Sequence, residues 1–95
     1  MNATLSKTQT FTWRDIEVRD LRSARARFIK KHGSMSIGAV KLRAPYMRIS
    51  HAFNGREWII WIIRLIAADL ELSNHEVLML WPLLGEWPKE DRRAA

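Results

Sequence analysis

The sequence predicts an all-α protein, a compact bundle of about five short helices. Apolar residues recur at helical spacing in several separate segments, which is the pattern of helices that bury one face. Residues that begin or end helices, such as Ser73 and Gly33, stand between these segments. No segment alternates polar and apolar residues in the manner of a half-buried strand.

The length and composition fit one small folded domain. The chain has 95 residues, of which 47% are hydrophobic, a normal value for a globular protein. A chain of this length has difficulty building a deep, walled cleft, so we expect no catalytic activity and no cofactor. The absence of cysteine excludes disulfides, thiolate zinc sites and thiol nucleophiles. We expect a flexible N-terminal arm at 1–11, the domain at 12–82 and a C-terminal tail at 83–95.

The sequence predicts a soluble, cytoplasmic protein. Residues 1–13 contain no apolar core of signal-peptide length. The longest apolar run, at 58–63, is much shorter than the ~20 apolar residues that a membrane-spanning helix needs.

The net charge of +6 is unevenly distributed along the chain. Residues 14–56 contain eleven Lys and Arg against three acids, whereas residues 57–95 contain four against seven. A basic half joined to a mildly acidic half is typical of a protein that binds a polyanion on one face. The alternative at this stage is a solvated basic surface without a partner.

The first predicted helix spans about residues 13–32. Thr12 stands three residues before Asp15, a variant of the capping box that opens helices, and Gly33 ends the segment. The apolar residues expected to face the core are Trp13, Ile16, Leu21, Ala24 and Phe28. The residues expected on the solvent face are Arg14, Arg19, Arg22, Arg25 and Arg27.

Two shorter helices follow, joined by a tight turn at residues 43–44. Ser34 or Ser36 is expected to cap the first of them, and its inward residues are Met35, Ala39 and Leu42. Pro45 suits the first position of the next helix, where its missing N–H costs nothing. The inward residues of that helix are Ile49, Ala52 and Phe53, and Asn54 with Gly55 ends it.

The fourth predicted helix, at about 57–71, is apolar nearly all round, which is typical of a helix buried on more than one side. Its expected core stripe is Ile59, Ile62, Ile63, Ile66 and Leu70. A fifth helix at about 74–81 begins with a capping box of Ser73 and Glu76 and ends at Pro82.

Several large apolar residues of the fourth helix and the tail are expected outside the core. Trp61, and to a lesser degree Ile60, point away from the core stripe, and Trp58 lies near its edge. Together with Trp87 they would form an apolar patch of the kind that marks interfaces. We expect this patch to be a dimer or partner interface. The alternative is that the fifth helix or the tail covers Trp61 in a monomer.

Two short helices joined by a tight turn, with a third helix ahead and an apolar one behind, are the architecture of a helix-turn-helix. The expected fold is therefore an all-α bundle containing a helix-turn-helix at about residues 34–55. The segment AVKLRAPYMRISHAFNG resembles the helix-turn-helix of the lambda repressor/Cro-like superfamily, and IAADLELS resembles the end of that superfamily's fourth helix. The Ala-Pro pair and Trp81-Pro82 are similar to features of Ner-type regulators of Mu-like phages.

The resemblance covers about residues 20–81, with two departures. Arg43 stands where the family usually has Gly in the turn, and Gly38 stands where it usually has a large aliphatic residue. We expect a Trp or Ile from the 57–71 helix to fill the space beneath Gly38.

The resemblance implies that the third helix enters the major groove of double-stranded DNA. The expected base contacts are Tyr46, Met47, Arg48, Ser50 and His51. The expected phosphate contacts are Lys41, Arg43, Asn54 and Arg56. For Arg48 and His51 the competing interpretation is an ordinary solvated side chain.

These observations predict a sequence-specific DNA-binding transcriptional regulator, such as a repressor, of phage or mobile-element type. Because one helix-turn-helix reads few base pairs, we expect a homodimer. The rival hypothesis is a protein-interaction module of antitoxin or anti-activator type, which keeps the fold but binds a protein through the 57–71 helix or the tail. A third hypothesis, RNA binding, requires exposed aromatics, and only Tyr46 qualifies in the basic half. The three histidines lack metal-ligand spacing, so we expect no metal.

Overall fold

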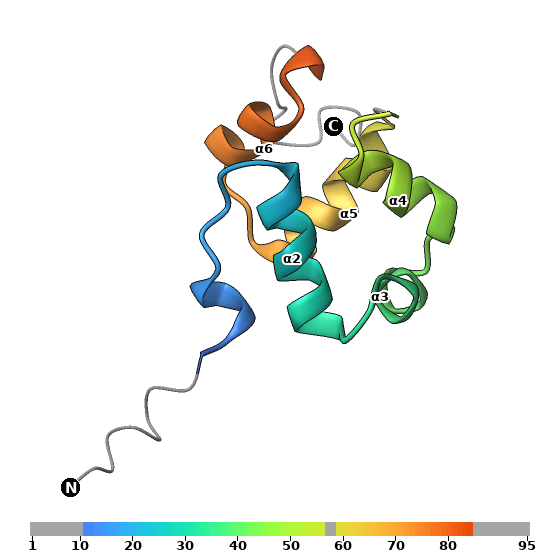
Figure 1. Cartoon of the computed structure of the whole chain (residues 1–95). Coiled ribbons are helices and arrows are strands. Elements are labelled where there is room, and N and C mark those ends of the chain that lie inside the picture. The colour runs from blue at the N-terminus through green and yellow to red at the C-terminus, as the bar shows by residue number, and fades with distance from the viewer. Residues whose placement is uncertain (1–10, 57–58, 85–95) are drawn as a thin grey trace, which may run out of the picture.

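The computed structural model describes residues 11–56 and 59–84, and within these ranges it contains helices and no strand (Figure 1). The elements in chain order are η1 (Trp13–Asp15), α2 (Leu21–His32), α3 (Met35–Leu42), α4 (Tyr46–Phe53), α5 (Ile60–Leu70), α6 (Asn74–Leu80) and η2 (Pro82–Leu84). The predicted all-α class is confirmed. The arm expected at 1–11 and the tail expected at 83–95 lie almost wholly outside the described residues.

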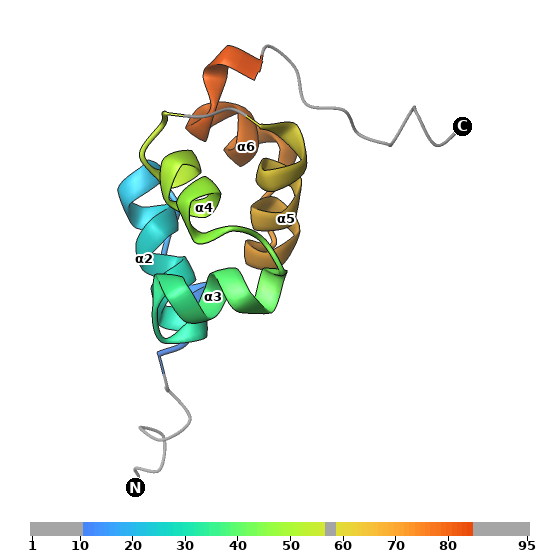
Figure 2. The same ribbon diagram turned by 90° about the vertical axis from the view of Figure 1, so that its right-hand side faces the viewer.

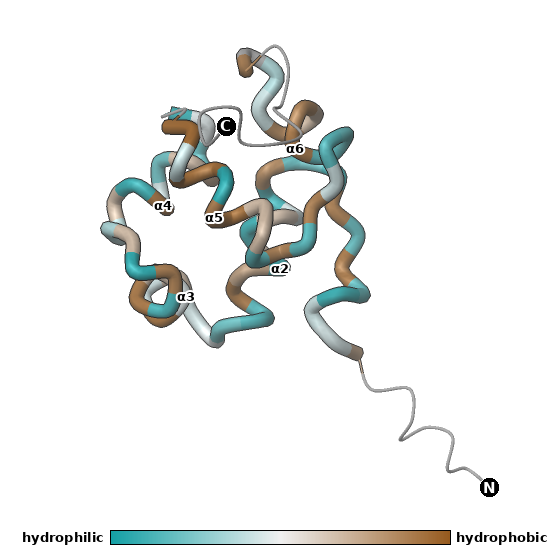
Figure 3. The backbone as a smooth tube through the Cα atoms, turned by 180° about the vertical axis from the view of Figure 1, so that it is seen from behind, coloured by the Kyte–Doolittle hydropathy of each residue, from teal (hydrophilic) through white to brown (hydrophobic). Residues whose placement is uncertain are grey.

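The helices enclose one apolar core. Helix α3 lies at one end of the bundle and α6 at the other, with α2, α4 and α5 between them (Figures 1 and 2). Hydrophobic and hydrophilic residues interleave along the helices, as expected where each helix buries one face (Figure 3). The side chains that are essentially inaccessible to solvent are Phe28, Ile49, Ile62, Ile63, Ile66, Leu70, Val77 and Trp81. The inward stripes predicted for the third and fourth helices are thus confirmed, except that Ile59 is only partly buried.

The prediction of one helix over 13–32 is wrong at its N-terminal end. The Asp15 carboxylate does accept a hydrogen bond from the Thr12 backbone N–H, at 2.7 Å, but this pair closes only the single turn η1. A second capping box lies further on, where the Asp20 carboxylate accepts from the Ser23 N–H at 2.8 Å. Helix α2 therefore begins at Leu21, and the segment between the two caps runs extended and buries Val18.

Arg27, expected on the solvent face, instead points inward and fastens this N-terminal segment. Its guanidinium donates to the backbone oxygens of Arg14, Ile16 and Leu70, at 3.2, 3.1 and 2.9 Å. The prediction failed because helical spacing identifies polar side chains but not carbonyl groups that need a donor. We call residues 11–19, which run beside α2, the strap.

A polar cluster next to Arg27 joins α2 to the end of α5. The Lys31 ammonium donates to the Asp69 backbone oxygen at 2.6 Å and to its carboxylate at 2.9 Å. The His32 Nε2 lies 2.8 Å from the other carboxylate oxygen, and both of these side chains are nearly inaccessible to solvent. The Trp13 ring of the strap lies 4.5 Å from the Lys31 ammonium, within cation–π range.

Gly38 lets α3 approach α2 closely. A Cβ built at this position would lie 2.3 Å from the Phe28 ring and 3.0 Å from the His32 ring. Phe28 and His32 of α2 therefore fill the space beneath Gly38, and the expectation of a Trp or Ile from the 57–71 helix is wrong. The reason is that α3 packs against α2 and α4 and hardly touches α5.

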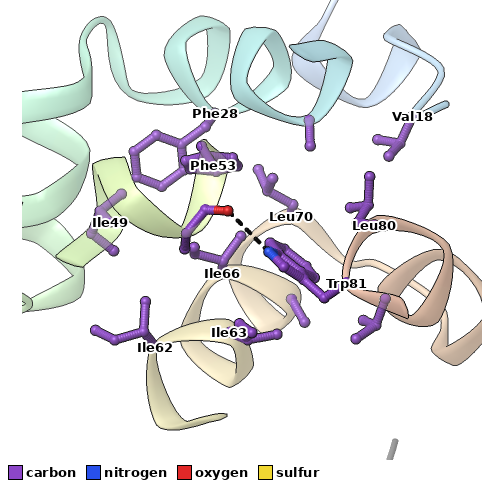
Figure 4. Close-up of a cluster of buried hydrophobic side chains, with 14 of the residues drawn as sticks. Val18, Phe28, Ile49, Phe53, Ile62, Ile63, Ile66, Leu70, Leu80 and Trp81 are labelled. Atoms are coloured by element: carbon purple, nitrogen blue, oxygen red, sulfur yellow. Dashed lines mark hydrogen bonds between the residues drawn. The ribbon is translucent and has the colours of Figure 1, made fainter. Parts of the chain in front are cut away.

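Trp81 connects α6 to α4. The predicted capping box of Ser73 and Glu76 is present, and α6 ends before Pro82 as expected. The Trp81 indole is completely buried, and its Nε1–H donates to the backbone oxygen of Ala52 at 3.0 Å (Figure 4). This hydrogen bond fixes the last turn of α4. In the parts of the chain described here, no helix is both long enough and apolar enough to cross a membrane.

Candidate nucleic-acid interface

The turn between α3 and α4 is tight and closed by backbone hydrogen bonds. The Ser34 hydroxyl accepts from the Ile37 N–H at 3.1 Å and caps α3, which confirms one of the two predicted caps. At the other end, Arg43 has φ 57° and ψ 44°, the left-handed conformation that glycine adopts most easily. The Ala44 N–H then donates to the Ala39 oxygen at 3.0 Å. Arg43 thus adopts the conformation that a turn glycine would supply.

Helix α4 begins one residue later than predicted. Pro45 is its N-cap, with φ −62° and ψ 134°, and the first helical residue is Tyr46. The Pro45 carbonyl accepts from the Arg48 and Ile49 N–H groups at 3.1 and 3.2 Å and so begins the hydrogen bonding of the helix. The N–H that proline lacks would have no acceptor within the helix at this position, so its absence costs nothing.

The outward face of α4 carries all five of the predicted base-contact residues. Tyr46 is 46% exposed, Met47 is 59% exposed and Arg48 is also exposed. Ser50 and His51 are half-buried. At about 100° per residue, Met47 and His51 lie opposite the buried stripe of α4, and Tyr46 and Arg48 lie at the two edges of that stripe. The five side chains are therefore spread around roughly 200° of the helix.

The four predicted phosphate-contact residues flank α4 at its two ends. Lys41 and Arg43 precede it, Asn54 and Arg56 follow it, and all four side chains are exposed. Gly55, with φ +72°, and a bond of 2.9 Å from the Arg56 N–H to the His51 oxygen turn the chain after the helix. Helix α4, which contains Arg48 and no acid, therefore has cations at both ends: Lys41 and Arg43 before it and Arg56 after it.

The charge around this surface has one sign. Residues 21–56 contain nine Lys and Arg and no Asp or Glu. Two of the nine, Arg27 and Lys31, point inward to α5 and the strap, which leaves seven others. The nearest acid before this stretch, Asp20, accepts the Ser23 backbone N–H, which lowers the pKa of its carboxyl. A surface of this composition attracts polyanions.

Sequence reasoning missed two exposed apolar side chains on α3. Ile37 is 49% exposed and Val40 is 75% exposed, next to the cation Lys41. The signal was present in the sequence, since the solvent side of the predicted second helix holds these two residues between Ser36 and Lys41.

The candidate interface residues of the fourth helix are only partly described. Ile60 is 41% exposed and Trp61 is 51% exposed on the outer side of α5, as the helical spacing predicts. Trp58 and Trp87 lie outside the described residues.

Across residues 11–56 and 59–84, no cluster of three or more His, Asp or Glu side chains is arranged to hold a metal ion. No family model, curated protein or solved structure matches this chain.

Proposed function

We propose that this protein is a sequence-specific double-stranded DNA-binding transcriptional regulator, of phage or mobile-element type, in which α3 and α4 act as a helix-turn-helix. The observation that carries the proposal is the surface of α4, where exposed side chains lie between flanking cations in a stretch of 36 residues, 21–56, without one acid. The resemblance of residues 39–55 to the lambda repressor/Cro-like motif supports the same assignment.

The proposed mechanism divides the contacts into two kinds. Helix α4 lies in the major groove, which is about 12 Å wide and admits one α-helix. Arg48 donates two hydrogen bonds to a guanine, and Met47 contacts a thymine methyl group. Lys41, Arg43, Asn54 and Arg56 contact phosphates and set the register of the helix without reading sequence.

Replacing Arg48 tests base recognition directly. A preferred duplex is first selected from a random-sequence library. Arg48→Ala is expected to weaken binding to that duplex by about 1–3 kcal/mol and to relax the preference at one base pair, because a bidentate contact to guanine is lost. Fluorescence anisotropy on the selected and scrambled duplexes gives the measurement.

The matched control is Arg19→Ala, which removes an arginine from the strap, where Arg19 forms an ion pair with Glu17 at 3.8 Å. This control should leave base preference unchanged. Equal loss on selected and scrambled duplexes in Arg48→Ala would mean that Arg48 contacts phosphate alone.

A second candidate function is a protein-interaction module on the same fold. The exposed Ile37 and Val40 of α3 and the exposed Trp61 of α5 favour it, because apolar groups of this size are common at the centres of protein interfaces. The salt dependence of duplex binding separates the two functions. DNA binding through phosphates falls steeply with salt, whereas an interaction module shows no such binding.

A further inference from the structure

The first turn of α2 lies against the loop that follows α4. A Cβ at Gly55 would lie 3.4 Å from the Leu21 Cδ1 atom, an ordinary van der Waals contact. The N-terminal end of α2 and the C-terminal end of α4 are neighbours in both views (Figures 1 and 2). Side chains on this part of α2 are therefore close to the proposed phosphate contacts Asn54 and Arg56.

The contacts of α2 fix which of its cations face that loop. Leu21 points to Gly55, and the Phe28 ring lies 5.2 Å from the Phe53 ring, so these two residues mark the side that faces α4. Arg27 marks the opposite flank, toward the strap and the end of α5.

Arg25 lies one helical turn beyond Leu21, about 40° around the helix axis at about 100° per residue, on the flank away from Arg27. Arg22 follows a further 60° or so in the same direction. Both side chains are exposed.

These two arginines do not stabilise α2 at the positions they occupy. Arg22 is in the first turn of α2, where the helix dipole disfavours a cation. Arg22 and Arg25 are three residues apart, the spacing at which like charges repel on a helix surface. Asp20, the acid closest in sequence, accepts the Ser23 N–H through its carboxylate and interacts with Arg22 through its charge. Residues 21–56 contain no further acid, so a phosphate backbone would supply additional anions to this pair.

We propose that the phosphate-binding surface continues from Asn54 and Arg56 across Gly55 onto α2, where Arg22 and Arg25 contact the backbone of the same DNA duplex. This inference rests on the proposed function. It adds a second helix to the proposed DNA interface and two contacts that the resemblance of residues 39–55 does not include.

The test measures how the logarithm of the binding constant falls with the logarithm of salt concentration on the selected duplex. Arg22→Gln/Arg25→Gln is expected to reduce the steepness of this line by about 1.8, since each phosphate contact contributes about 0.9. The ratio of affinities for selected and scrambled duplexes should stay constant, because phosphate contacts carry no sequence information. Arg22→Lys/Arg25→Lys keeps both charges and should restore most of the slope.

The control Arg19→Gln/Lys30→Gln removes the same charge from two other positions, one before α2 and one near its C-terminal end. Arg19 lies in the strap, and Lys30 lies at the far end of α2, over the Phe11 ring at 5.6 Å. The control should change the slope by much less than the test pair. Thermal unfolding checks that all variants remain folded.

Equal slopes in the test and control pairs, with salt-dependent binding intact in the wild type, would overturn this inference and leave the proposed function standing. A wild type whose duplex binding shows no salt dependence would overturn both.

Discussion

At the scale of single residues, the most informative position is Arg43, a non-glycine residue in the left-handed conformation at the turn. For a residue with a Cβ this conformation costs roughly 1–2 kcal/mol, and the tight turn between α3 and α4 imposes it. If Arg43 contacts phosphate, as proposed, its side chain contributes to binding while its backbone conformation lowers the stability of the turn.

Arg43→Gly and Arg43→Val measure this conflict. Glycine should leave the free energy of unfolding unchanged or raise it by up to about 1 kcal/mol, because relief of strain is offset by the greater freedom of the unfolded chain. Valine, which is β-branched, should lower it by more than about 1 kcal/mol. Urea denaturation checks both values. Equal stability of the two variants would show that the turn is not left-handed in solution.

Single residues also show the limit of prediction from sequence. The spacing of apolar residues correctly predicted that Ile49, Ala52 and Phe53 are buried. It could not predict that Arg27 points inward, because its acceptors are carbonyls that carry no sequence signal. The same limit applies to Lys31, whose partner Asp69 is 38 residues away in the chain.

At the scale of elements, α4 depends on its neighbours. A helix of eight residues is not stable in water alone, so the shape of the proposed recognition surface is set by packing against the core. Ile49 and Phe53 supply the apolar part of this packing, and the Trp81 indole supplies a hydrogen bond to the last turn.

Trp81→Phe should therefore destabilise the protein by about 1–3 kcal/mol, from the lost hydrogen bond and the smaller ring. The Ala52 oxygen keeps the Gly55 N–H as a donor, so it is not left unsatisfied. Chemical denaturation gives the value, and amide exchange in α4 should accelerate. Trp61→Phe is the matched control, since Trp61 is half exposed and should cost much less. Equal losses in the two variants would contradict the role assigned to Trp81.

The boundaries of the elements were predictable where one cap signal stood alone. Ser73 correctly predicted the start of α6, and at α3 the structure uses Ser34, one of the two predicted caps. Before α2 the prediction used only Thr12 with Asp15, whereas the structure also has a capping box of Asp20 with Ser23. Whether residues 13–32 form one helix or two elements depends on the burial of Val18 and the hydrogen bonds of Arg27. Both are tertiary contacts, which the local sequence pattern does not contain.

At the scale of the whole molecule, we propose that the protein acts as a homodimer through the outer side of α5. Ile60 and Trp61 are exposed side by side there, and tryptophan is the residue most enriched at the energetic centres of interfaces. A two-fold contact would present two copies of α4 to paired half-sites.

Sedimentation at micromolar concentration tests the dimer. The wild type should sediment as a dimer, and Trp61→Glu should sediment as a folded monomer, because a charge is costly to bury in an apolar contact. Its DNA affinity should fall with the loss of the second half-site. A monomeric wild type that binds its selected duplex at full affinity would contradict the proposal.

The three hydrogen bonds that the Arg27 guanidinium donates affect how the molecule unfolds. One guanidinium satisfies carbonyls of two strap residues and the final carbonyl of α5, groups that come from segments far apart in the chain. Detaching the strap would break two of these three hydrogen bonds at the same moment and leave the guanidinium with the Leu70 oxygen alone, which is costly in a partly buried setting. Partial opening at this seam is therefore penalised, and the strap and the bundle form a single cooperative unit.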